Sequence, residues 1–76
     1  MTNEDLWNGI ANLASSKGLT CSGLARISGL DATIFNKSKR RTKLGQLRWP
    51  STYAIAKILT ATNTSLADFA ELMKKK

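Results

Sequence analysis

Residues 20–41 read TCSGLARISGLDATIFNKSKRR, and this stretch decides the expected fold. Thr20 has a side chain suited to cap a helix, and apolar residues follow it at helical spacing as far as residue 28. Gly29 then supplies the residue type that most readily adopts a left-handed turn after a helix. The stretch thus predicts a short helix over residues 21–28 that stops at a glycine turn.

The segment after this glycine predicts a second short helix with two different faces. Asp31 is suited to cap it, and it is expected to cover residues 32–39. At 100° per residue, Ile34 and Phe35 share one side. The opposite side is polar and basic, with Thr33, Asn36, Lys37 and Arg40. Two short helices joined in this way are typical of a helix-turn-helix, whose second helix enters the major groove of DNA.

Three more helices are predicted, one before this pair and two after it. The first covers residues 2–17, where Thr2 and Asp5 form the pattern of a capping box. The second opens at residues 50–52, and the third follows Ser65. No stretch alternates apolar and polar residues for long enough to indicate a strand. The 76-residue chain is therefore expected to be one all-α domain, a compact bundle of about five short helices.

A basic loop is predicted in the centre of the chain. Residues 41–50 lack a helical period, and Leu44, Leu47 and Trp49 are expected to tether this loop to the core. The net charge is +7, and half of the twelve basic residues fall within residues 37–48, with no acid among them. Such a concentration of positive charge is typical of a protein that binds a polyanion.

Composition excludes several other functions. The chain has no His and one Cys, which excludes a Ser-His-Asp triad, an internal disulfide and the usual zinc sites. No enzyme activity, cofactor, metal ion or small-molecule substrate is expected. No apolar run approaches the roughly 18 residues that a membrane span needs, and the acidic MTNED terminus does not resemble a signal peptide. A single Cys suits a reducing compartment, so a cytoplasmic location is expected.

The chain resembles a known family of DNA-binding proteins. Residues 20–41, followed by RWPS at 48–51 and IAKIL at 55–59, resemble the Cro/λ-repressor-like helix-turn-helix domain. The closer likeness is to the phage-type, LexA-like repressors of alphaproteobacteria, and it covers residues 6–73. It implies the DNA-reading domain of a transcriptional repressor, with a homodimer on a palindromic operator. Such repressors carry a further peptidase and dimerisation domain, so a lone module or an N-terminal part is expected.

The resemblance also implies a role for individual side chains. Those expected to face the bases are Ala32, Thr33, Asn36 and Lys37. Asn suits adenine, Lys suits guanine, and Thr can meet a thymine methyl group. Those expected at DNA phosphates are Thr20, Ser22, Lys39, Arg40, Arg41, Lys43, Arg48, Ser51 and Thr52. The last two would offer hydroxyls and free amides at a helix start.

Two other classes of function stay open at this point. The charge alone also supports a non-specific or RNA-binding basic module. Single-strand binding favours exposed aromatic rings, however, and Trp7, Phe35 and Phe69 are expected in the core. A protein-interaction or antitoxin-like domain is the other class, because Leu66, Phe69 and Met73 could present a dimer face.

Overall fold

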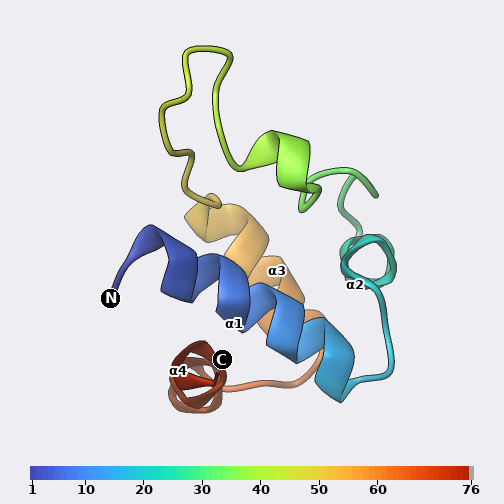
Figure 1. Cartoon of the computed structure of the whole chain (residues 1–76). Helices are drawn as coiled ribbons and strands as arrows, with labels where there is room; N and C mark the ends of the chain where they lie inside the picture. Colours follow the sequence, from blue (N-terminus) through green and yellow to red (C-terminus); the bar gives the residue numbers. More distant parts are fainter. Residues whose placement is uncertain (76) are drawn as a thin grey trace.

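The computed structural model describes residues 1–75 and is all-helical over that range. Lys76, the last residue of the terminal lysine run, lies outside it. The helices are α1 (Asn3–Ser16), α2 (Cys21–Ile27), the short 3₁₀ helix η1 (Lys37–Lys39), α3 (Thr52–Ala61) and α4 (Leu66–Lys74). α1 crosses the middle of the molecule and packs against α4 and α2, while α2 also contacts α3 (Figure 1). None of these helices is both long and apolar enough to cross a membrane.

A hydroxyl side chain starts each of the four α-helices. Its oxygen accepts a hydrogen bond from the backbone amide three residues later, which satisfies one of the unpaired amides of the first turn. These pairs are Thr2–Asp5, Thr20–Gly23, Ser51–Ala54 and Ser65–Asp68. The Asp5 carboxylate also accepts from the Thr2 amide at 2.9 Å, so the predicted capping box is confirmed.

The helices enclose one apolar core. Trp7, Phe35 and Phe69 are buried, as predicted, and Phe35 is the largest fully buried side chain. The other core side chains are Ile10, Leu13, Ala14, Leu24, Ala25, Ala54, Ile58 and Leu59. The turn after α2 has the expected form, because Gly29 has a φ of 73°.

The junction between α1 and α4 is unusually close. A Cβ atom on Gly9 would lie 2.6 Å from Cγ of Met73 and 3.1 Å from Cζ of Phe69. Beside it, Nδ2 of Asn12 donates to the carbonyl oxygens of Leu72 at 2.8 Å and Lys75 at 3.1 Å. Asn12 thereby gives the carbonyl groups at the end of α4 a side-chain donor, in addition to the Lys75 amide that donates to the Leu72 carbonyl.

The predicted helix over residues 32–39 is wrong. Residues 32–35 form a turn, in which the Ile34 amide donates to the Asp31 carbonyl at 3.1 Å. Asn36 is extended, with a ψ of 150°, and the chain then makes η1. Of the five helices expected from the sequence, four are α-helices and the third is replaced by this turn and η1.

Local chemistry explains the break. The Asp31 carboxylate accepts from the amide and the hydroxyl of Thr33, at 2.8 Å and 2.6 Å. Such a side-chain bond competes with helical backbone bonding. Thr33, Ile34 and Asn36 are also weak helix formers, and an eight-residue helix needs tertiary packing of an apolar face to be stable. Only Phe35 of this segment is buried.

Two glycine substitutions should have opposite effects on stability. We expect Gly9→Ala to destabilise the fold by about 1–3 kcal/mol, because the new methyl group overpacks the α1–α4 junction. Gly23→Ala is the matched control, since its Cβ would meet nothing closer than 3.4 Å. It should stabilise the fold by about 0.5 kcal/mol through the lower flexibility of the unfolded chain. Urea unfolding of both variants measures the difference, and equal effects would contradict the close packing.

Candidate nucleic-acid interface

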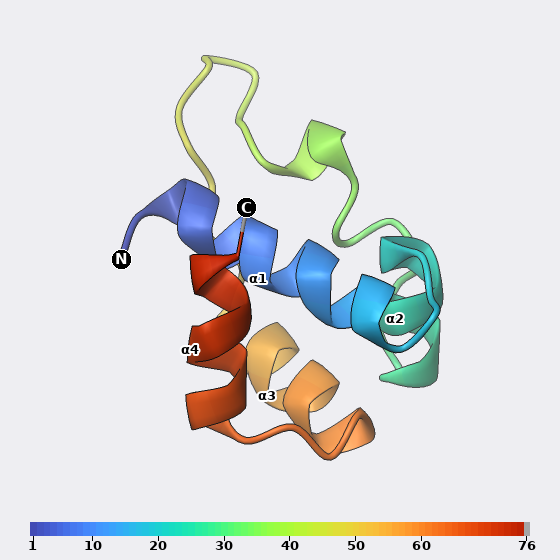
Figure 2. The same cartoon turned by 60° about the horizontal axis from the view of Figure 1, so that its bottom comes forward.

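Residues 40–48 form a small antiparallel hairpin, which we call the basic hairpin. The Thr42 amide donates to the Gln46 carbonyl at 2.8 Å, and the Arg48 amide donates to the Arg40 carbonyl at 2.9 Å. Between these bonds, Arg41 and Leu47 pair as an isolated β-bridge. The loop predicted for this region is therefore an ordered arm, which stands away from the helices (Figures 1 and 2).

The tip of the basic hairpin is the three-residue turn Lys43-Leu44-Gly45. The Gly45 amide donates to the Thr42 carbonyl at 2.9 Å, and Gly45 has a φ of 81°. A β-turn followed by a left-handed glycine is a common way to close a three-residue hairpin loop. The Thr42 hydroxyl also accepts from the Leu44 and Gln46 amides, and Nη1 of Arg41 donates to the Gly45 carbonyl. Gly45 is the sequence signal for this turn, although together with Pro50 it predicted only a loop.

The base of the basic hairpin is fixed to α1 by polar bonds. Nε1 of Trp7 and Nδ2 of Asn3 both donate to the Arg48 carbonyl oxygen, at 3.1 Å and 2.9 Å. The Arg40 guanidinium lies 5.0 Å from the centre of the Trp7 ring, within the range of a cation–π contact. Trp7 also meets Phe35 edge to face, with ring centres 6.4 Å apart. The indole therefore contacts both the core and the hairpin.

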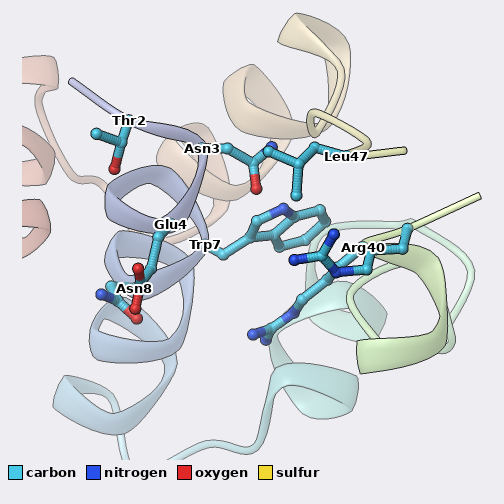
Figure 3. Close-up of a pocket in the computed structure, with 8 residues that line it drawn as sticks. Thr2, Asn3, Glu4, Trp7, Asn8, Arg40 and Leu47 are labelled. Atoms are coloured by element: carbon cyan, nitrogen blue, oxygen red, sulfur yellow. The ribbon is translucent and has the colours of Figure 1, made fainter. Parts of the chain in front are cut away.

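An open cleft lies between this part of α1 and the hairpin. Figure 3 shows the Trp7 indole on α1 facing Arg40 and Leu47. The residues that line the cleft are Thr2, Asn3, Glu4, Trp7, Asn8, Arg40, Arg41 and Leu47. Nε of Arg40 is buried there and makes no hydrogen bond within the described residues.

The predicted apolar tether of the loop is wrong. Leu44 is 86% exposed, Leu47 52% and Trp49 55%. The carbonyl of Arg48 takes their place as the attachment point. No local sequence pattern marks this bond, because its donors on α1 lie 41 and 45 residues away.

The expected base-reading residues lie on the turn and η1 and do not share one helix face. Thr33, Asn36 and Lys37 are exposed, whereas Ala32 is half-buried. The hydroxyl proton of Thr33 is donated to Asp31, so this side chain keeps only acceptor capacity. Asn36, in its extended conformation, and Lys37 remain on the surface next to the basic hairpin.

Asp31 stabilises this turn through its side-chain hydrogen bonds to Thr33. The hydrogen bonds from the Thr33 hydroxyl and amide lower the pKa of the Asp31 carboxyl below its usual 3.8, and Lys39 adds to the effect. A lowered pKa means that the charged form stabilises the folded turn at pH values above 3.8. This contribution is lost as the pH falls through the lowered pKa.

The structure gathers most of the expected phosphate contacts but not all of them. Lys39, Arg40, Arg41, Lys43 and Arg48 lie along η1 and the basic hairpin, and only Arg40 among them is half-buried. Ser51 and Thr52 follow closely at the start of α3. Thr20 and Ser22 lie at the start of α2, beside the end of α1 and away from the hairpin (Figures 1 and 2). The Thr20 and Ser51 oxygens accept from helix amides, which leaves each hydroxyl proton able to donate.

Comparison of the chain with family models, curated proteins and solved structures finds no match. Within residues 1–75, no three His, Cys, Asp or Glu side chains lie close enough together to hold a metal ion. The candidate interface offers cationic, amide and hydroxyl donors.

Removing the indole N–H should loosen the basic hairpin. Trp7→Phe keeps an aromatic ring in the core but deletes the bond to the Arg48 carbonyl and leaves a small cavity, so we expect a loss of about 1–3 kcal/mol. The Arg48 amide should also exchange with deuterium faster, whereas the Ala54 amide of α3 should not change. Trp49→Phe is the matched control and should leave both amides unaffected. Unchanged exchange at Arg48 in Trp7→Phe would contradict the anchoring role of the indole.

Proposed function

We propose that this protein is a sequence-reading, double-stranded DNA-binding domain of a transcriptional repressor of the phage type. One observation carries the proposal: a projecting arm of exposed basic side chains that no acid interrupts. The chain has no Asp or Glu from residue 32 to residue 67. The basic residues on this arm and η1 are Lys37, Lys39, Arg40, Arg41, Lys43 and Arg48.

The placement of these charges supports a duplex as the partner. The basic side chains lie along η1 and the ordered hairpin, and not on the solvent-exposed face of an α-helix. An extended array of cations is suited to successive phosphates, and the release of counterions from DNA supplies much of the affinity. Hydroxyl and amide donors at the start of α3 add a further phosphate site next to the hairpin.

Base reading is assigned to the turn and η1. α2 and the left-handed Gly29 match the first half of a helix-turn-helix. Residues 32–39, which form a turn and η1, would take the place of its second, base-reading helix. Asn36 and Lys37 offer the donors and acceptors that suit adenine and guanine edges in the major groove. A homodimer on two half-sites would supply the affinity that one small module lacks.

A second candidate is supported by the exposed aromatic rings. Trp49 and Tyr53 are both on the surface, and Lys57 lies 5.9 Å from the centre of the Tyr53 ring. Bases of a single strand can stack on such rings beside a basic groove. Competition between single-stranded and duplex DNA of the same sequence distinguishes the two, and preference for the single strand would replace the leading proposal.

Asn36→Ala should relax sequence preference. Selection from a random duplex pool should enrich a motif for the wild-type protein, and the variant should lose preference at one base pair of it. The expected loss is about 1–3 kcal/mol at that position, because one pair of hydrogen bonds to a base is removed. Thermal unfolding checks that the variant is folded. If Asn36→Ala enriches the wild-type motif unchanged, Asn36 does not read a base.

Lys43→Ala should instead weaken all duplexes to the same extent. We expect the slope of log K against log salt concentration to become shallower by about one, because one phosphate contact is lost. Lys74→Ala removes the same charge from α4, where Lys74 pairs with Glu71 at 3.4 Å, and serves as the matched control. Equal slopes for Lys43→Ala and the wild-type protein would place the hairpin tip away from the DNA.

A further inference from the structure

The tip of the basic hairpin exposes an apolar side chain among charged ones. Leu44 is the most exposed of the large apolar residues in the described part of the chain. A single exposed leucine is ordinary on a protein surface. Here, however, three of the seven exposed large apolar residues lie between positions 44 and 49, namely Leu44, Leu47 and Trp49. Apolar groups are thus concentrated where the basic charge is also highest.

The tip is narrow and held in place. A Cβ atom at Gly45 would meet nothing within 4 Å, so the space beside this residue of the turn is open. The Leu44 amide donates to the Thr42 hydroxyl at 3.3 Å, which restrains the backbone of the turn. At the other end, the Arg48 carbonyl is bonded to α1. The arm therefore presents the leucine side chain at its far end, in a fixed direction from the core.

We infer that the basic hairpin enters the minor groove of duplex DNA and that Leu44 inserts between two base pairs. Proteins that bind in the minor groove use apolar side chains in this way to unstack a base step and bend the duplex. The groove is about 6 Å wide, which suits a tip with one large side chain. Lys43, next to Leu44 in the turn, and Arg41, whose guanidinium donates to the Gly45 carbonyl, would meet the phosphates that border the groove. This inference rests on the proposed binding of double-stranded DNA.

The arrangement of charge favours DNA over a lipid surface. A membrane would meet the tip of the arm, where Lys43 and the Arg41 guanidinium are the cations near Leu44. The other basic side chains run back from the tip to η1, along the length of the arm. The phosphates along a DNA groove can contact basic side chains over the whole length of the arm. A flat lipid surface would contact only those at the tip.

Fluorescence of 2-aminopurine tests the insertion directly. The probe is placed at a central TA step in an A·T-rich duplex of about twenty base pairs, because such steps unstack easily. Dyes on the two duplex ends report bending by energy transfer. The wild-type protein should raise the 2-aminopurine fluorescence and bring the ends closer together. Leu44→Ser should lose both signals, whereas Leu44→Met should keep them.

The controls separate this inference from the proposed function. Leu66→Ser removes a leucine of similar exposure, 72%, from the start of α4 and should behave as the wild-type protein does. If the wild-type protein binds the duplex without either signal, the insertion is wrong and the proposed function stands. If it binds no duplex, including one enriched from the random pool, the proposed function itself fails. If it instead sediments with phosphatidylserine vesicles and Leu44→Ser does not, the apolar tip serves a lipid surface and the inference is overturned.

Discussion

The carbonyl oxygen of Arg48 is the point through which the basic hairpin is attached to the helical core. It accepts two hydrogen bonds, one from the Trp7 indole and one from the Asn3 amide. Trp7 also packs edge to face on Phe35, so its ring joins the hairpin to the core. The geometry of the arm therefore depends on burial of apolar side chains in the bundle, although the arm itself buries almost none.

This separation explains how a small domain can carry so much like charge. Cations repel one another, and they lose favourable hydration when they are buried. The residues from Arg41 to Trp49 are all exposed, so their charges stay in water and weaken the fold little. Arg40 is the exception, and its guanidinium is compensated by the face of the Trp7 ring. The apolar core between the four α-helices stabilises the fold, and the hairpin carries exposed positive charge.

Local chemistry made the four α-helices predictable from the sequence. Thr2, Thr20, Ser51 and Ser65 each cap a helix through a contact three residues away, so the pattern is visible in the chain itself. Residues 32–39 carried similar signals, but there Asp31 bonds to Thr33 in a turn instead of capping a helix. The basic side chains of the candidate site were predictable as a cluster. Their position on a hairpin attached to α1 was not predictable, because the attachment depends on bonds between residues far apart in sequence.

The close approach of α1 and α4 has a consequence for the order of events during synthesis. Asn12 of α1 bonds to Leu72 of α4, 60 residues later, and Gly9 of α1 lies against side chains of α4. At about 5–20 residues per second, the ribosome needs roughly 3–12 s to make that intervening chain. Until then, the side of α1 that packs against α4 lacks its partner. A nascent chain of this protein therefore cannot complete its core before α4 has left the exit tunnel.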